Sequence, residues 1–213
     1  MRIGILGSGL MADALGGQWV RAGHEVMVGG RDRLKSADLA GRIGASSGSL
    51  LEASAFGEVT LLAVPAEAVS EVLTGGPPGR FAGRTVLDCT NAVIPGDFTL
   101  AVPAMAEQVA QLAPDAHVVK AFNLAPDTVW QDAPCTFEGE PLGVPFCGDD
   151  EAANEQVAVL IRALGCTPVK AGALVRARLL EATAALAIGL WVDGADTRSL
   201  FPPKAAAFGT VHP

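Results

Sequence analysis

Short apolar runs alternate with longer amphipathic stretches along most of this chain. Ile3–Leu6, Val59–Val64, Thr85–Asp88 and His117–Phe122 have the length and composition of buried strands, and helical spacing recurs between them. This alternation is typical of a mostly parallel sheet that is covered by helices on both faces. We therefore predict an α/β fold of the Rossmann type, doubly wound around one sheet.

Two segments depart from this alternation. Ser46–Ser49 is polar and predicts a loop, whereas Ala173–Trp191 predicts the longest helix of the chain. We expect residues 1–172 to form the Rossmann domain and residues 173–213 to form a C-terminal helix and tail.

A glycine-rich turn follows the first strand and opens the first helix. Its spacing is G-x-G-x-x-A, running from Gly7 to Ala12. Gly7 permits the tight turn, Gly9 lets a pyrophosphate approach the backbone, and Ala12 lets helix and strand pack closely. The helix N-terminus adds free N–H groups and partial positive charge. The turn thus predicts a dinucleotide site with contacts from Gly7, Ser8, Gly9, Leu10 and Met11.

The end of the second strand favours NADP over NAD. An NAD site usually carries an acidic residue at the position of Gly30, and here Gly30 is followed by Arg31. A guanidinium can pair with a 2′-phosphate through two hydrogen bonds and stack on adenine. Ser8 could donate to the same phosphate. Asp32 argues the other way, although it lies one position late for the NAD role.

The carboxyl ends of the other strands should meet the glycine turn at one crevice. These ends lie at Val64-Pro65, Thr90-Asn91 and Phe122-Asn123. We expect flat rings to pack against Val64, Pro65, Ala121 and Phe122. Asn91 and Asn123 could orient a carboxamide or an acceptor ring, although a strand-end turn suits each asparagine as well. The predicted catalytic residues are Pro65, Asn91 and Asn123, and the predicted cofactor contacts at this crevice are Val64, Pro65, Asn91 and Ala121.

Charge and composition limit the partners. The net charge of −8 over 213 residues argues against a nucleic-acid surface. The apolar stretch Ala182–Val192 is much shorter than the roughly 20 residues of a membrane span, and the N-terminus does not resemble a signal peptide. We expect a cytoplasmic protein that binds neither nucleic acid nor membrane. Cys89, Cys135, Cys147 and Cys166 show no metal or redox spacing, so we expect reduced, buried thiols and no metal site.

Further segments extend the pattern beyond the glycine turn. These are Met1–Gly9, Gly23–Val26, Gly29–Arg31, Val119–Asn123, Phe146–Asp150, Val169–Leu174 and Arg178–Glu181. Together they resemble the F420-dependent NADP oxidoreductase family, and they are similar to the reductase domain of the STEAP metalloreductases. The resemblance implies a Rossmann fold with NADP(H), and hydride transfer between the nicotinamide and a deazaflavin or flavin. It also implies that the C-terminal segment helps form a second-substrate pocket and a homodimer.

We therefore predict an enzyme, an NADP(H)-dependent oxidoreductase that passes hydride between NADP(H) and coenzyme F420 or a flavin-like acceptor. Such transfer needs mainly positioning of two rings. Archaeal members of the family carry a histidine where this chain has Asn123, so FMN, FAD, ferric complexes and small carbonyl or imine compounds stay open beside F420. Two other hypotheses are an NADP(H)-binding sensor without turnover and a dehydrogenase of small imino or hydroxy acids. The dehydrogenase would need a poised lysine or histidine, for which Lys120 is a candidate.

The C-terminal helix gives its own evidence for a partner. From Leu179 to Trp191 its only charge is Glu181, and a helix this apolar must be buried on more than one side. Small residues at Ala182, Ala185 and Gly189 would allow close approach of a second copy. We therefore expect a homodimer with this helix at its interface.

Overall fold

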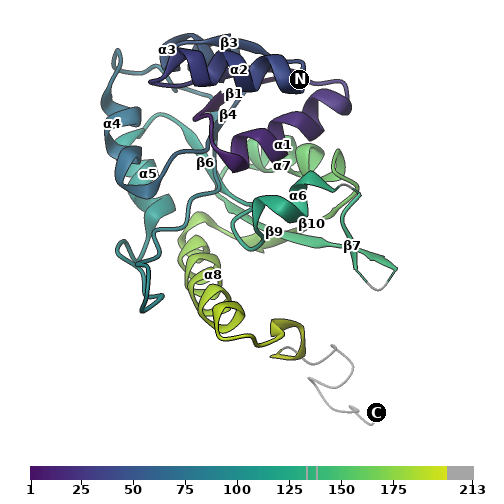
Figure 1. Cartoon of the computed structure of the whole chain (residues 1–213). Helices are drawn as coiled ribbons and strands as arrows, with labels where there is room; N and C mark the ends of the chain where they lie inside the picture. The colour runs from purple at the N-terminus through teal and green to yellow at the C-terminus, as the bar shows by residue number, and fades with distance from the viewer. Residues whose placement is uncertain (133, 138, 201–213) are drawn as a thin grey trace.

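The computed structural model describes residues 1–132, 134–137 and 139–200 (Figure 1). Its main sheet consists of β1 (Arg2–Leu6), β2 (Glu25–Gly29), β3 (Ser46–Gly48), β4 (Val59–Leu62), β5 (Thr85–Asp88), β6 (His117–Lys120), β9 (Gly143–Gly148) and β10 (Thr167–Gly172). These eight strands have the order β10-β9-β6-β5-β4-β1-β2-β3. All neighbours from β3 to β6 are parallel, and β9 runs antiparallel to β6. The predicted Rossmann-type, mostly parallel sheet is confirmed.

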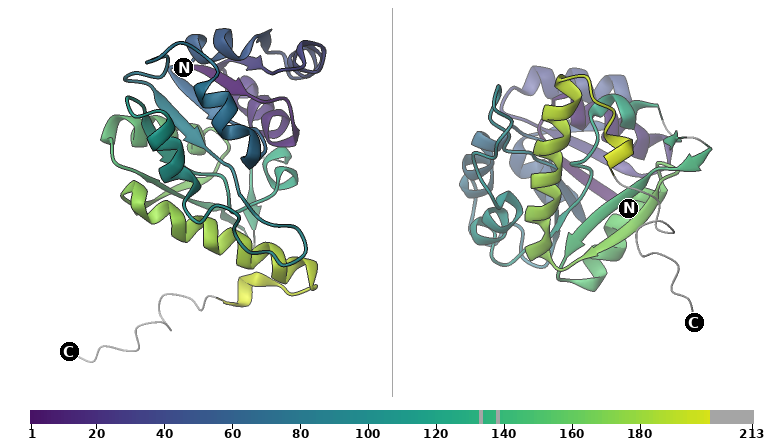
Figure 2. Two further views of the ribbon diagram at one scale, coloured as in Figure 1. Left: turned by 90° about the vertical axis from the view of Figure 1, so that its left-hand side faces the viewer. Right: turned by 90° about the horizontal axis from the view of Figure 1, so that it is seen from below.

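Helices cover both faces of this sheet, as Figures 1 and 2 show. They are α1 (Leu10–Arg21), α2 (Arg33–Ile43), α3 (Leu50–Phe56), α4 (Val69–Thr74), α5 (Met105–Leu112), α6 (Asp127–Gln131), α7 (Glu151–Arg162) and α8 (Ala177–Val192). One core contains Trp19 of α1 and Trp130 of α6, together with apolar residues of α7. The other contains Val69 of α4, Met105 of α5 and Ala177 of α8. Apolar residues at helical spacing on one side of each helix produce these two layers.

The prediction of a loop at Ser46–Ser49 is wrong. Ser46–Gly48 form β3, which pairs with β2 at the edge of the sheet. A polar strand of three residues shows no hydrophobic alternation, so its sequence cannot be distinguished from a loop. The hairpin of β7 (Thr136–Phe137) and β8 (Glu140–Pro141) is equally short.

The C-terminal segment forms the predicted long helix with a slightly later start. A single 3₁₀ turn, Leu174–Arg176, precedes α8. Figure 2 shows α8 lying along one end of the molecule, where it packs against α5 and β9. Residues 201–213 of the predicted extension lie outside the described residues. Within the described part of the chain, no helix combines the length and hydropathy needed to cross a membrane.

Candidate active site

The glycine loop joins β1 to α1 at the carboxyl edge of the sheet, as predicted. Gly7 has a φ of +125°, and a Cβ there would lie 2.1 Å from the carbonyl oxygen of Ala63. Glycine is therefore required where the loop touches the chain after β4. Gly9 is different, because a Cβ at this position would meet no atom of the described part of the chain within 4 Å. The open space beside Gly9 and the N-terminus of α1 leave room and free N–H groups for a phosphate.

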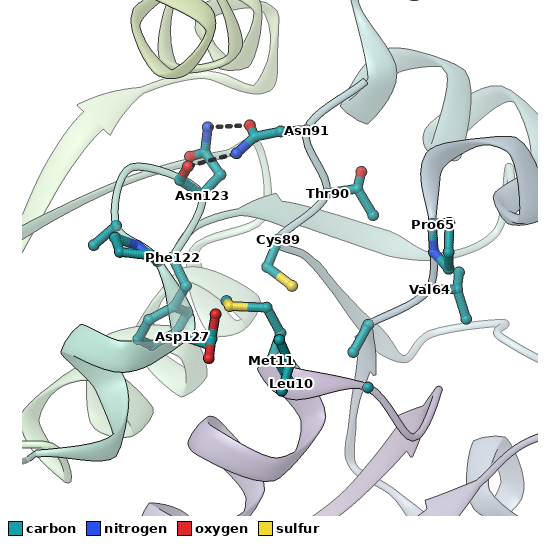
Figure 3. A pocket seen from close by; sticks show the side chains of 14 residues that line it. Leu10, Met11, Val64, Pro65, Cys89, Thr90, Asn91, Phe122, Asn123 and Asp127 are labelled. Carbon is teal, nitrogen blue, oxygen red and sulfur yellow. Dashed lines mark hydrogen bonds between the residues drawn. The ribbon is translucent and has the colours of Figure 1, made fainter. Parts of the chain in front are cut away.

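A cavity of about 400 Å³ opens beside this loop, and we call it the glycine-loop cavity. Its walls come from the carboxyl ends of four parallel strands and from α6, where a doubly wound sheet places its ligands. Of the predicted site residues, its lining includes Gly9, Leu10, Met11, Val64, Pro65, Asn91 and Asn123 (Figure 3). Phe122, against which a ring was also predicted to pack, lines it too, and the remaining lining residues are Ala63, Cys89, Thr90, Ala125, Pro126 and Asp127.

Ala121 does not reach this cavity. Its side chain is fully buried in the core. Ala121 therefore packs inside the subunit and does not offer the predicted surface to a ring. Phe122 has a φ of +63°, which is unusual for a bulky residue. Its ring lies edge-on to Trp19 and Trp130, with centroids 6.0 and 5.3 Å away. The Phe122 ring therefore supports the cavity wall from within the core.

Asn91 and Asn123 lie side by side in the cavity wall, with their side chains turned toward each other (Figure 3). Asn91 Nδ2 donates to the Asn123 carbonyl oxygen at 2.7 Å, and Asn123 Nδ2 donates to Asn91 Oδ1 at 3.1 Å. Asn123 Nδ2 also lies 3.1 Å from the carbonyl oxygen of Leu180 in α8. Asn123 is 4% exposed, and its Oδ1 has no hydrogen-bond partner among the residues that the structure describes. A buried acceptor without a donor is costly in a protein alone, so this oxygen is the polar atom of the asparagine pair that still lacks a partner.

Arg31 and Gly30 lie next to the glycine loop, outside the cavity wall. A Cβ at Gly30 would lie 2.4 Å from Ser36 Oγ and 3.6 Å from Ser8 Oγ. The acidic side chain of an NAD site therefore does not fit here without movement. The Arg31 side chain is 65% exposed, and its Nη1 lies 3.4 Å from Glu71 Oε2. This loose surface pair leaves the guanidinium available to a phosphate.

Asp32, which argued for NAD, has a structural role. Its side chain accepts hydrogen bonds from the backbone N–H groups of Leu34 and Lys35, at 3.0 and 3.1 Å. Asp32 is thus the N-cap of α2.

Cys89 and Asp127 belong to the cavity wall but were not predicted as site residues. Burial raises the pKa of the Cys89 thiol to about 12, with a further contribution from the Asp88 carboxylate. Its Sγ donates to the carbonyl oxygen of Leu62 at 3.2 Å, so this thiol stays neutral and unreactive. Asp127 opens α6. The Pro126-Asp127 pair, a common helix start, is the signal that could have placed it here.

Lys120 was the candidate lysine of the dehydrogenase hypothesis, and the structure gives it a different place. Its side chain is 0% exposed, and its Nζ lies 2.9 Å from Asp88 Oδ2 and 3.0 Å from Glu181 Oε1. Burial alone would lower the pKa of Lys120, but the two carboxylates outweigh it and raise the pKa. An ammonium held in this way does not act as a base at the cavity.

A second cavity, of about 280 Å³, lies between the β6 end of the sheet and α8. We call it the α8 cavity. Its lining consists of Asn91, Asn123, Leu124, Ala125, Pro126, Ala184, Ile188, Trp191 and Val192. Asn91 and Asn123 also line the glycine-loop cavity, so the two spaces adjoin at the asparagine pair.

The remaining candidate chemistry lies elsewhere. His117 begins β6 and lies 3.6 Å from Asp150, and His24 precedes β2, so both belong to the opposite edge of the sheet. The four cysteines are free and buried, as predicted. In the described ranges, no group of three or more His, Cys, Asp or Glu side chains is arranged to hold a metal ion.

A glycine loop that opens into a cavity at the carboxyl edge of a doubly wound sheet defines a Rossmann-type dinucleotide-binding protein. Residues 2–92 match the model of the family described as NADP oxidoreductase, coenzyme F420-dependent. Metalloreductase STEAP3 of Rattus norvegicus is 33% identical over 181 residues, which cover 85% of this chain and 36% of STEAP3. The chain thus spans about a third of the length of this curated relative.

Solved structures agree with these matches. A candidate F420-dependent NADP reductase from Arthrobacter sp. FB24 is 25% identical with a TM-score of 0.80, covering 90% of this chain and 93% of that protein. An imine reductase from Aspergillus terreus, 22% identical with a TM-score of 0.67 over 91% of this chain and 60% of its own, shares the fold. The family model and the Arthrobacter structure both make the chain similar to proteins described as F420-dependent NADP oxidoreductases. They confirm its predicted resemblance to the F420-dependent NADP oxidoreductase family.

Proposed function

We propose that this protein transfers hydride between NADP(H) in the glycine-loop cavity and a flat acceptor, such as F420 or a flavin, in the α8 cavity. The observation that carries the proposal is the pair Asn91 and Asn123, which lines both cavities. Rings bound in the two spaces would meet at this pair. Hydride transfer between two rings depends on their contact and alignment, which is what such a junction can supply.

The residues around the glycine loop suit NADP(H). Gly9 and the first N–H groups of α1 would hold the pyrophosphate, while Arg31 and Ser8 would hold the 2′-phosphate. The space at Gly30 is closed to an acid by Ser36 Oγ, which lies 2.4 Å from the point where a Cβ would stand. These features support the predicted preference for NADP over NAD.

The asparagine pair would orient the rings. Asn123 uses its Nδ2 on Asn91 and Leu180, which leaves Oδ1 as an acceptor. This oxygen could accept from the carboxamide N–H of the nicotinamide or from an N–H of the acceptor ring. Because no proton need be moved to C4 of the nicotinamide, positioning of this kind suffices for the chain's part in the reaction.

The exposed side of α8 supports a homodimer, through a different stripe from the predicted one. Ala185 is only 5% exposed, and Phe98 of the same chain lies 3.3 Å from a Cβ placed at Gly189. Ala185 and Gly189 therefore pack against the subunit itself, whereas Ala182 is exposed on the same side of α8 as Leu179 and Leu186. Leu179 and Leu186, 52% and 58% exposed and two helical turns apart, form the apolar side that a second copy would cover.

A steady-state screen tests this function. Purified protein is mixed with NADPH and, separately, with F420, FMN, FAD or a ferric chelate, and oxidation is followed at the NADPH absorbance. We expect turnover with a deazaflavin or flavin. Stoichiometric NADPH binding without oxidation by any acceptor would favour the sensor hypothesis instead. Turnover only with small imines or carbonyl compounds would favour the dehydrogenase hypothesis.

A further inference from the structure

Three buried charged side chains connect the sheet to α8. Asp88 at the end of β5 and Lys120 at the end of β6 are 0% exposed, and Glu181 of α8 is 1% exposed. The Lys120 ammonium bridges the two carboxylates, and we call the three residues the buried triad. Charges are buried at a desolvation cost that pairing only partly offsets, so such a group is weak evidence for stability alone. Its contacts show what else it could do.

On the sheet side, the buried triad holds the residue before Asn91. Asp88 Oδ1 accepts from the backbone N–H of Thr90 at 2.9 Å and from Thr90 Oγ1 at 2.7 Å. Lys120 Nζ donates to the carbonyl oxygen of Thr90 at 2.5 Å. The backbone N–H, the backbone carbonyl and the hydroxyl of Thr90 are thus all hydrogen-bonded to the buried triad. These bonds fix the position of the backbone that leads into Asn91.

On the helix side, the buried triad holds α8 beside Asn123. The Glu181 carboxylate accepts from the backbone N–H groups of Met105 and Ala106, at 2.9 and 3.0 Å, at the start of α5. This satisfies two free donors of that helix and places a negative charge at its positive end. Leu180, the neighbour of Glu181, presents its carbonyl oxygen to Asn123 Nδ2.

We propose that Lys120 and Glu181 are positioning residues for hydride transfer, which hold Asn91 and Asn123 at the junction of the two cavities by fixing the Thr90 backbone and α8 to one another. The proposal rests on the proposed function. The buried triad touches neither cavity, since neither lining includes Asp88, Lys120 or Glu181 among its residues. It acts through Thr90 and Leu180.

Glu181→Gln tests this role. The change keeps the shape of the side chain and leaves Lys120 paired with Asp88, so the remaining buried charges still balance. Arg178→Gln is the matched control, because the Arg178–Glu107 pair at 2.6 Å joins the same two helices, α8 and α5, on the surface. The first readout is hydrogen–deuterium exchange of the backbone at residues 89–92, and the second is steady-state kinetics with NADPH and its acceptor.

We expect faster exchange at residues 89–92 in Glu181→Gln and wild-type exchange there in Arg178→Gln. The kcat/KM for the acceptor should fall by about ten- to a hundredfold in Glu181→Gln, whereas the NADP⁺ Kd should change by less than about twofold. Faster exchange confined to Met105 and Ala106 would show a purely structural role and overturn the proposal. So would equal acceptor kinetics in the two variants.

Two further results are distinguishable. If none of the acceptors tested supports NADPH oxidation by the wild-type protein, the proposed function fails. Exchange at residues 89–92 still decides whether the buried triad holds the junction. If Glu181→Gln does not fold, Glu181→Asp replaces it, because it keeps the charge but is too short to reach both Lys120 and α5. Wild-type exchange at 89–92 in folded Glu181→Asp would overturn the proposal.

Discussion

The glycine-loop cavity and the α8 cavity are neighbours, but they are built in different ways. The phosphate-binding part of the first depends on backbone conformation within one short stretch, where Gly7 has a φ of +125° and Gly9 leaves open space. The second depends on side chains far apart in the sequence, such as Asn91 with Asn123 and Glu181 with Met105, separated by 32 and 76 residues. The family model matches residues 2–92, which contain the first construction. A backbone site can serve one cofactor in many proteins, whereas a site of long-range side-chain contacts can be altered to suit another acceptor.

The sharpest test of the backbone construction is Gly9→Val. A Cβ at Gly9 would meet no described atom within 4 Å, and the backbone of Gly9 is extended, with φ −91° and ψ −170°, so valine fits the free protein. The side chain would occupy the space of the pyrophosphate. We expect the NADPH Kd, measured by titration calorimetry, to rise at least about a hundredfold, or ~2.7 kcal/mol, without a change in the thermal midpoint.

Gly7→Val is the matched control, because it places the same side chain two residues earlier. There the Cβ would meet the Ala63 carbonyl oxygen at 2.1 Å, in a backbone conformation that valine avoids. We expect the free energy of unfolding to fall by about 3 kcal/mol or more. Equal stability of the two variants, or normal NADPH binding by Gly9→Val, would contradict the assigned roles.

The same contrast explains what could be predicted from the sequence. Glycine spacing and strand ends are local signals, so the loop and the asparagines at the strand ends were predicted with their surroundings. The buried triad was not, because charged residues such as Asp88 and Glu181 are mostly exposed in proteins, and the sequence alone gives no reason to bury them. Strand alternation along β6 would put Phe122 on the same face as Val118, but Phe122 has a positive φ and its ring joins the core of Trp19 and Trp130 instead. Such reversals depend on tertiary packing around Trp19 and Trp130, which no local pattern contains.

Substitutions on α8 test the helix that forms one wall of the α8 cavity, on its exposed side. Leu186→Glu changes a side chain that is 58% exposed, whereas Ala185→Glu changes its neighbour, which is 5% exposed. If Leu186 lies in a dimer interface, an unpaired glutamate there should dissociate the dimer and leave the folded subunit intact. Ala185→Glu should instead lower the thermal midpoint, because its carboxylate would enter the subunit core. Light scattering with size-exclusion chromatography at micromolar concentration checks both variants, and a monomeric wild-type protein would refute the interface.

The smallest expected effect lies beside the glycine loop, where the Arg31 side chain and not the backbone would contact the cofactor. Charge-assisted hydrogen bonds contribute about 1.5–3 kcal/mol, and the 65% exposure of Arg31 points to the lower end of that range. Arg31→Ala should therefore weaken NADPH binding about tenfold and leave NADH binding nearly unchanged. Glu71→Gln is the complementary variant, because it releases Arg31 from its surface pair and should tighten NADPH binding slightly. Titration of both cofactors separates the outcomes. An equal loss for NADPH and NADH in Arg31→Ala would mean that the guanidinium contacts a part shared by the two cofactors, and the basis for preferring NADP would then rest on Gly30 and Ser8 alone.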